Sequence, residues 1–314
     1  MHYALCIMKT LLVIFGPTGV GKTALAIDVA KRLQTEIVNA DSRQIYRELP
    51  IGTAAPTEEE QKLVKHRFVG NRSITEDYNA GMYEREALSV ISELHKQHDT
   101  VVLTGGSMMY IDAVCKGLDE LPAVSEATRA KVQQQYREGG IEWLQQEVQK
   151  SDPEYYAIVD RQNPQRLIHA IEITRQAGVP YSALRSGKKA QRDFRIVQVG
   201  LYRQREELYR RIDQRVLDMM RQGLEEEARL VYPLRGINSL NTVGYKEMFD
   251  YFDGNTTLEE AIALIQQHSR NYAKRQMTWW KTPRGGNSEQ LTADSDIHWF
   301  DATTVKTEDI LNLI

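Results

Sequence analysis

The sequence predicts an α/β fold: a parallel sheet flanked by helices, with an all-helical insertion domain. Three observations lead to this prediction. A glycine-rich loop lies between an apolar strand and a helix near the N-terminus. Strand and helix patterns then alternate as far as residue 116. Strand patterns are absent from residues 117–192 and return at 194–202.

The glycine-rich loop follows an apolar strand at residues 10–15 and precedes a helix expected at 24–33. It has every fixed position of the phosphate-binding loop G-x-x-x-x-G-K-[ST]. Its residues are Gly16, Pro17, Thr18, Gly19, Val20, Gly21, Lys22 and Thr23. Glycines let backbone N–H groups turn toward a phosphate, and the helix N-terminus adds its dipole. The motif predicts a P-loop NTPase-like fold that binds a di- or triphosphate, with Lys22 on the outer phosphates and Thr23 on Mg²⁺ or a phosphate oxygen.

Two further strands end in polar segments. A short apolar strand at 36–40 ends at Asp41-Ser42, and a third strand at 99–103 is followed by a Gly-Gly-Ser segment at 105–107. Strands that alternate with helices pair in parallel, and ligands gather at the carboxyl ends of such strands. We therefore expect these segments and the phosphate loop to form one crevice.

The core is predicted to be discontinuous. We expect it to comprise residues 1–116 and 193–314, with the helical insertion at 117–192, where Gly139-Gly140 ends one helix. The other predicted elements are helices at 142–150, 165–177, 204–232 and 258–281, and strands at 194–202 and 297–300; residues 284–295 are polar and are expected to lack regular structure.

Composition places this chain of 314 residues among ordinary globular proteins, with 41% hydrophobic and 26% charged residues. The formal net charge is −3, so a surface for nucleic acid must be local. Cys6 and Cys115 lack metal-ligand spacing, which favours a reduced cytoplasmic setting without zinc. The apolar N-terminal residues run into the phosphate-loop strand, so we expect neither a signal peptide nor a membrane segment. Nothing in the sequence indicates an obligate partner chain, and we expect a monomer.

Two charged residues are candidates for the chemistry. Asp41 follows a strand beside the loop, where it could act as a general base or cap the next turn. Arg215 lies on the apolar stripe of the 204–232 helix, where it could point to a phosphate or cover the core with its stem. The strand that ends at Leu103 carries no acid of the kind that holds Mg²⁺ in P-loop NTPases. This favours an enzyme in which the phosphates form a transferring or leaving group.

Basic residues cluster in two segments. Residues 185–215 hold ten Lys or Arg against four Asp or Glu, and residues 266–286 hold five basic residues and no acid. The second segment includes Lys274 and Arg275 and is interleaved with tyrosine and tryptophan. Such segments can be solvated helix faces, but in an acidic chain the aromatic residues among them favour RNA as a partner.

Several motifs accompany the phosphate loop in a fixed order. They are Asp-Ser-Arg-Gln-Ile-Tyr at 41–46, Ile-Gly-Thr-Ala at 51–54, Asn-Pro-Gln-Arg-Leu at 163–167, Val-Gly-Tyr-Lys-Glu at 243–247 and Tyr-Ala-Lys-Arg-Gln-Met-Thr-Trp at 272–279. With them the chain resembles the bacterial tRNA dimethylallyltransferases, which isopentenylate the adenosine 3′ of the anticodon. The resemblance extends from Leu12 to about Lys281.

This resemblance implies an activity and a set of roles. The chain is expected to transfer a dimethylallyl group from dimethylallyl diphosphate to N6 of that tRNA adenosine, with release of diphosphate. Asp41 is implied as the base, and Thr23 and Arg215 are implied to stabilise the leaving diphosphate together with Mg²⁺. The insertion is implied to grip the anticodon stem-loop while the target base is flipped out. Implied tRNA contacts are Asp41, Ser42, Arg43, Gln44, Ser107, Arg129, Gln165, Arg166, Leu167, Ile168 and His169, to which the basic segment adds Lys274 and Arg275.

The chain departs from the family's pattern in two places. Ser107-Met108-Met109 stands where the family usually has Thr-Gly-Leu, and His169 stands where arginine is common. Two other functions stay open: a small-molecule or nucleoside kinase that uses ATP, and an RNA-binding module with a regulatory phosphate loop. The motif at 41–46 and the basic C-terminal helix count against a kinase, and the pair of Asp41 and Arg215 counts against a passive binder.

Overall fold

The structure is a computed structural model of the chain, and it describes residues 8–185, 190–280 and 297–314. Its strands are β1 (Thr10–Phe15), β2 (Ile37–Asn39), β3 (His66–Arg67), β4 (Thr100–Gly105), β5 (Arg195–Tyr202) and β6 (Ile297–Asp301). Its α-helices are α1 (Lys22–Arg32), α2 (Glu58–Leu63), α3 (Ala80–Leu94), α4 (Met108–Lys116), α5 (Glu126–Ser151), α6 (Pro153–Ile158), α7 (Pro164–Ala177), α8 (Tyr181–Leu184), α9 (Arg205–Gln222), α10 (Leu224–Val231), α11 (Tyr245–Phe252), α12 (Leu258–Trp279) and α13 (Thr307–Leu311). Short 3-10 turns cover Tyr232–Leu234 and Asn238–Leu240.

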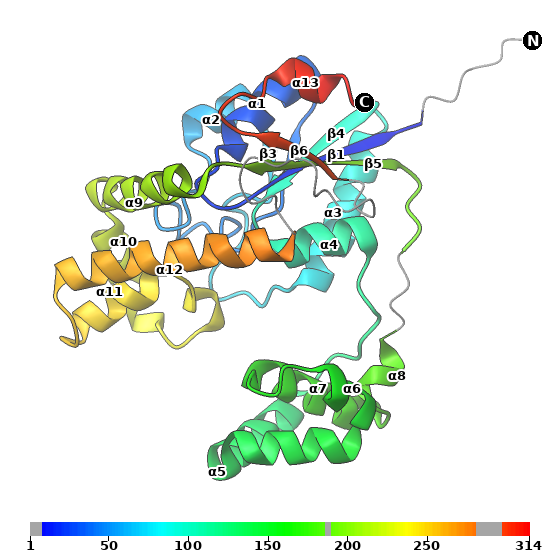
Figure 1. Cartoon of the computed structure of the whole chain (residues 1–314), viewed down its shortest axis with the longest axis vertical. Helices are drawn as coiled ribbons and strands as arrows, with labels where there is room; N and C mark the ends of the chain where they lie inside the picture. The colour runs from blue at the N-terminus through cyan, green and yellow to red at the C-terminus, as the bar shows by residue number, and fades with distance from the viewer. Residues whose placement is uncertain (1–7, 186–189, 281–296) are drawn as a thin grey trace, which may run out of the picture. The chain divides into compact units, whose positions relative to one another are not determined.

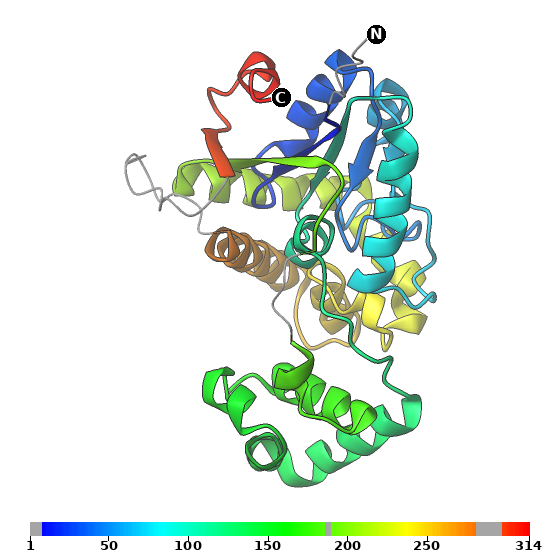
Figure 2. The same cartoon turned by 90° about the vertical axis from the view of Figure 1, so that its right-hand side faces the viewer.

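The strands form one sheet in the order β3-β2-β4-β1-β5-β6, and each neighbouring pair is parallel. This confirms the predicted parallel α/β sheet. Strand β1 is buried along its whole length, and its side chains alternate between two hydrophobic clusters. One cluster includes apolar side chains of α1 and α13, and the other includes those of α3 and α4 (Figures 1 and 2). Because helices cover both faces, the central strand is apolar at successive positions rather than alternating.

Sheet register determines where the loops after the strands lie. Phe15, the last residue of β1, is paired with Gly105 of β4 and Gly200 of β5. Asn39, which ends β2, is paired with Thr104. The segments after β1, β2 and β4 therefore emerge at the same edge of the sheet, where ligands bind in folds of this class.

The predicted strands at 10–15, 36–40, 99–103, 194–202 and 297–300 are confirmed as β1, β2, β4, β5 and β6. The single helix predicted at 204–232 was wrong. Gly223 has a φ of +101°, a left-handed conformation that ends α9 before α10 begins. Gly140, with a φ of +62°, likewise puts a kink inside α5. The predicted loop at 284–295 lies outside the described residues.

Contacts divide the chain into two compact units. One comprises Met1–Cys115 with Gln191–Ile314, and the other comprises Lys116–Ala190. Regular structure in the second unit is helical over its described residues, and it has its own core. That core contains Val132, Leu144, Val148, Tyr155, Val159, Leu167, Ile168, Ala170 and Ile171.

Candidate active site

A pocket of about 740 Å³ opens at the carboxyl edge of the sheet. It is lined by the phosphate loop, the turn after β2, the turn after β4, and the helices α9 and α12. These segments contribute Lys22, Asp41, Gly106, Arg215 and Gln276, which are far apart in the sequence. The expected crevice is therefore present, and both helices contribute side chains to it.

The start of α1, at the end of the phosphate loop, presents backbone donors to the pocket. Gly21 begins α1 with a φ of +109° and without a side-chain cap, and the N–H groups of the first helical turn have no acceptor within the helix. The loop carbonyls are bound from outside: Arg211 Nε donates to Gly19 O at 2.9 Å and Arg203 Nε donates to Val20 O at 2.8 Å. With the carbonyls held in this way, the open N–H groups and the helix dipole form an anion site. Thr23 also lines the pocket.

Lys22 is the cation of the loop. Its Nζ donates to Pro17 O at 3.0 Å. The pKa of Lys22 is lowered to about 8, chiefly by burial and next by the positive charge of Arg215, against an opposing effect of Asp41. A lysine in this condition is charged near neutral pH and gains stabilisation when a phosphate anion binds beside it.

Asp41 both caps a turn and faces the pocket. Its Oδ1 accepts hydrogen bonds from Arg43 N at 2.9 Å and Gln44 N at 3.3 Å. Its Oδ2 would lie 3.6 Å from a Cβ built on Gly106, and Lys22 Nζ would lie 3.9 Å from that same point. Oδ2 takes no hydrogen bond within the described part of the chain, so one carboxylate oxygen supports the fold and the other is open to a substrate.

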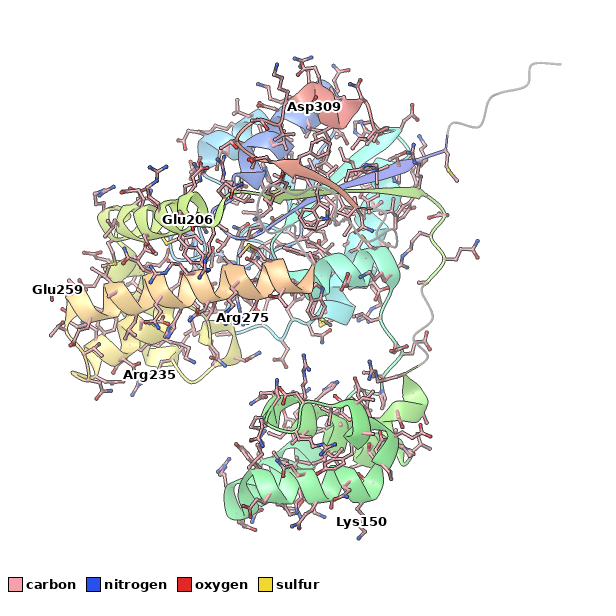
Figure 3. All side chains as sticks on the ribbon, viewed as in Figure 1. Lys150, Glu206, Arg235, Glu259, Arg275 and Asp309 are labelled. Atoms are coloured by element: carbon pink, nitrogen blue, oxygen red, sulfur yellow. The ribbon has the colours of Figure 1, made fainter. Side chains whose placement is uncertain are left out.

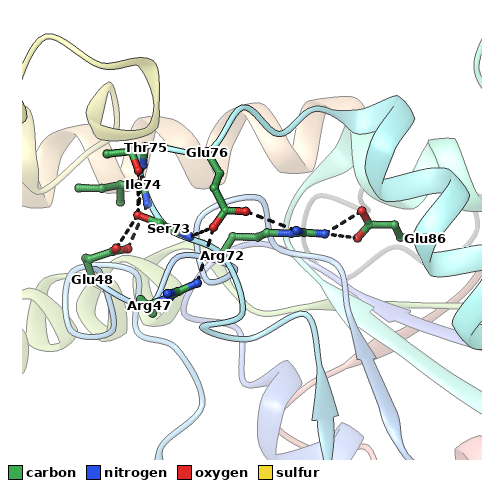
Figure 4. Close-up of polar contacts among 8 residues, drawn as sticks. All are labelled: Arg47, Glu48, Arg72, Ser73, Ile74, Thr75, Glu76 and Glu86. Atoms are coloured by element: carbon green, nitrogen blue, oxygen red, sulfur yellow. Dashed lines mark hydrogen bonds and ion pairs between the residues drawn. The ribbon is translucent and has the colours of Figure 1, made fainter.

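The turn after Asp41 is held by a neighbouring segment. Arg72 N donates to Ile45 O and Arg47 N donates to Arg72 O, each at 3.0 Å. Figure 4 shows how Arg72 is fixed in turn: its guanidinium pairs with both oxygens of Glu86 at 2.7 and 2.8 Å and reaches Glu76 at 3.3 Å. This network of ion pairs anchors the segment at Arg72, which is hydrogen-bonded to the turn after Asp41.

Arg215 points toward the phosphate loop. Its Nη1 donates to Thr18 Oγ1 at 3.1 Å and its Nη2 donates to Thr53 O at 3.3 Å. Burial lowers the pKa of Arg215, and the charge of Asp41 opposes that change. Of the two orientations that the sequence leaves open, the structure has the guanidinium directed into the pocket.

Ser107 joins the turns after β2 and β4. Its Oγ accepts from Ser42 N at 2.7 Å and donates to Ser42 Oγ at 3.0 Å. The departures next to it differ in exposure: Met108 is half-buried against the core, whereas Met109 is exposed. The hydroxyl of Ser107 thus already has an intramolecular partner beside Asp41.

The turn residues Arg43 and Gln44 also have partners. Arg43 Nη1 donates to Asn238 O at 3.3 Å and to Ser239 O at 3.0 Å. Gln44 Nε2 donates to Thr53 O at 3.1 Å and to a neighbouring carbonyl at 3.0 Å. Both side chains therefore tie the turn to adjacent loops of the pocket.

Sequence reasoning missed Gln276 as a site residue. Its side chain is fully buried, and it lies between the phosphate loop and Gly106. A signal was present: Gln276 falls three residues after Ala273 and four before Trp280, both buried, so a polar side chain occupies an apolar position of the helix.

Residues of the insertion differ in exposure. Arg129, Gln165, Arg166 and His169 are exposed. Leu167 and Ile168 are buried in the core of the insertion, where their side chains pack α7 against α5. The side chains of Leu167 and Ile168 therefore do not reach solvent, and the implied tRNA contacts of residues 165–169 stay a prediction.

Two exposed cations lie on α12, and one of them, Arg275, lines the pocket. Lys274 and Arg275 are both exposed, and Arg275 lies over the ring of Tyr272, 5.6 Å from its centroid. Figure 3 labels Arg275 on this helix. The same helix thus carries cations outside and Gln276 inside.

No group of three or more His, Cys, Asp or Glu side chains that could hold a metal ion occurs in the described ranges. Among the described helices, none is both long and apolar enough to cross a bilayer.

Comparison with known proteins identifies the family. The family model described as IPP transferase matches residues 44–283. The chain belongs to the IPP transferase family. A tRNA dimethylallyltransferase of Porphyromonas gingivalis is 53% identical over 291 residues, with 93% of each chain covered.

Solved structures agree with the IPP transferase assignment. The full-length tRNA isopentenylpyrophosphate transferase of Bacillus halodurans has a TM-score of 0.67 and 34% identity, covering 97% of this chain and 94% of its own. A eukaryotic dimethylallyltransferase acting on tRNA has a TM-score of 0.77 at 23% identity, covering 94% of this chain and 74% of its own, and supports the fold alone.

Proposed function

We propose that this IPP transferase transfers a dimethylallyl group from dimethylallyl diphosphate to N6 of the tRNA adenosine 3′ of the anticodon. The observation that carries the proposal is one pocket that brings Lys22 and Arg215 together with the open oxygen of Asp41. Two cations suit a diphosphate, and a carboxylate suits an amine that must lose a proton.

At C1 of the dimethylallyl group the reaction forms one bond and breaks one, and a proton moves from N6 to Asp41. The N6 amine attacks C1 of the dimethylallyl group, while the bond from C1 to the diphosphate oxygen breaks. The electron pair of that bond leaves with the diphosphate. Asp41 Oδ2 accepts the proton that N6 loses, because the amine nitrogen becomes positive as its bond to carbon forms.

The charge that develops on diphosphate is stabilised by this chain in three ways. Lys22 supplies a positive charge, Arg215 supplies guanidinium donors, and the first turn of α1 supplies N–H groups. The Thr23 hydroxyl, which lines the pocket, would hold Mg²⁺, and the ion would supply further positive charge to the leaving diphosphate.

The RNA is held by exposed cations at the pocket and on the insertion. We assign Lys274 and Arg275 to its phosphates, because both are exposed, and exposed Lys and Arg side chains neutralise a nucleic-acid backbone. On the insertion, the exposed Arg129 and Arg166 are suited to the same purpose. Base extrusion then brings the adenine to Asp41.

A kinase that uses ATP is the alternative within this fold. It is less well supported because β4 is followed by Gly106 and Ser107, without an acid to hold a metal at the strand end. The two activities differ in which group leaves the donor, and this difference can be measured directly.

The test incubates the full chain with bulk tRNA and either isotopically labelled dimethylallyl diphosphate or γ-labelled ATP. We expect prenyl label in tRNA, diphosphate in solution, and little ATP hydrolysis. A Lys22→Ala variant should lose transfer and serves as the control for contaminating enzymes. Robust ATP hydrolysis without tRNA, and no label in tRNA, would refute the proposed function.

A further inference from the structure

We propose that Gln276 is a positioning residue that joins the diphosphate half of the active site to the half that contains Asp41. The proposal rests on the proposed transferase function. We assign this side chain no contact with either substrate; it fixes the groups that bind and react.

Gln276 makes one hydrogen bond to each half. Its Oε1 accepts from Thr18 N of the phosphate loop at 2.9 Å, and its Nε2 donates to Gly106 O after β4 at 2.7 Å. The side chain is fully buried. In the interior an unpaired amide is costly, and here both of its polar groups are paired on two different catalytic loops.

On the diphosphate side, Gln276 acts through Thr18. The backbone N–H of Thr18 binds Gln276, and the hydroxyl of the same residue accepts from Arg215 Nη1 at 3.1 Å. A shift of Thr18 would therefore move the partner that orients the guanidinium. The position of Arg215 on α9 therefore depends on the side chain of Gln276 on α12.

On the Asp41 side, Gln276 acts through Gly106. Tyr272, one turn earlier on α12, places its hydroxyl on the same carbonyl at 3.2 Å. The next residue, Ser107, is hydrogen-bonded to Ser42, which follows Asp41. Gly106 also leaves room for this approach, since a Cβ there would lie 2.8 Å from Gln276 Nε2.

A carboxamide of this length suits the link. It offers an acceptor to an N–H group and a donor to a carbonyl from one side chain, and asparagine is one methylene shorter. The same helix carries the exposed cations Lys274 and Arg275. Gln276 thus connects α12, which carries these cations, with the phosphate loop and with the turn after β4.

A positioning role predicts a particular kinetic pattern. Gln276→Met keeps the side-chain volume but removes both hydrogen bonds. Misplacement of a catalytic group by about 1 Å can cost on the order of a hundredfold in rate, so we expect kcat to fall about ten- to a hundredfold. The KM for tRNA should stay within about twofold, because the exposed cations that we assign to RNA remain.

The matched control is Gln267→Met, the same substitution at an exposed position of the same helix. Steady-state kinetics, thermal melts and calorimetry with inorganic diphosphate are measured for the wild type and both variants. The affinity for diphosphate should fall about three- to tenfold in Gln276→Met only, the effect of about one net hydrogen bond. If that variant does not fold, Gln276→Asn is measured instead, with the same expectation.

The outcomes separate the two proposals. A folded Gln276 variant with kcat within about threefold of the wild type would overturn the positioning role, as would an equal loss in the control. A wild type that binds diphosphate but transfers no prenyl group would refute the proposed function, and the calorimetry would still test Gln276. A wild type that does neither would overturn both.

Discussion

Replacement of Asp41 by asparagine separates chemistry from structure at the centre of the site. The carboxylate has two oxygens with different partners. Oδ1 accepts from Arg43 N at 2.9 Å and Gln44 N at 3.3 Å, and Oδ2 is open toward the pocket. Asparagine keeps the first oxygen as an acceptor and replaces the second by an NH₂ group that cannot take a proton.

The two roles of Asp41 predict effects of very different size. Asparagine caps about as well as aspartate, so the melting temperature should change by no more than about 2 °C. A general base typically contributes about a hundred- to ten-thousandfold in rate, which is about 3 to 5 kcal/mol in the barrier. We therefore expect turnover to fall at least about a hundredfold with little change in stability.

A second consequence concerns Lys22. The charge of Asp41 raises the pKa of Lys22, so its removal should lower that pKa below about 8. A smaller fraction of Lys22 would then be charged in the variant than in the wild type. The ratio of the variant's charged fraction to that of the wild type would be lower at pH 8 than at pH 7. The defect of Asp41→Asn should accordingly deepen as the pH rises over this interval.

Single-turnover transfer of labelled dimethylallyl groups to tRNA, at pH 7 and pH 8, measures both effects. The matched control is Asp301→Asn, because Asp301 Oδ1 also accepts a backbone N–H, that of Thr303 at 2.9 Å, outside the pocket. Near-normal turnover in Asp41→Asn would remove this residue from the mechanism. A loss of turnover matched by a loss of folded protein would make Asp41 a structural cap only.

Three other perturbations test separate parts of the molecule. The affinity for inorganic diphosphate should fall as the pH rises through about 8, because Lys22 is charged only below its pKa. Calorimetry measures this affinity against pH; a fall no steeper in the wild type than in Lys22→Arg would contradict the prediction. Joint replacement of Lys274 and Arg275 by alanine should flatten the log-log salt dependence of tRNA binding by roughly 1.5 to 2 units, and an unchanged slope would mean that neither touches phosphate. Asp152→Ala removes a buried acceptor of Ser182 N at 2.7 Å and should destabilise the insertion by about 2 to 4 kcal/mol, seen as faster hydrogen exchange over 116–190 in the full chain. Unaltered exchange would refute that estimate.

Local sequence determines the half of the site that could be predicted. Strand β1, the phosphate loop and α1 are consecutive, so their pattern and glycines identify them without any knowledge of distant residues. The turns at Asp41 and Ser107 were also predicted, because parallel pairing forces the ends of β2 and β4 to the edge where β1 ends. The break at Gly223 was missed because the apolar periodicity continues across it, although glycine in a left-handed conformation ends the helix.

The rest of the site lies on helices α9 and α12. Their positions depend on tertiary packing, which the register of the sheet does not determine. Arg215 and Gln276 occupy apolar positions of their helices, and there a polar group can either snorkel to solvent or bind inside. Sequence periodicity cannot distinguish these outcomes, because the choice depends on partners 197 residues away for Arg215 and 258 residues away for Gln276. α9 and α12 pack against each other and both reach the phosphate loop through Thr18. A polar residue at an apolar helix position is therefore a candidate site residue. Its hydrogen-bond partner can be identified only when the packing of the helices is known.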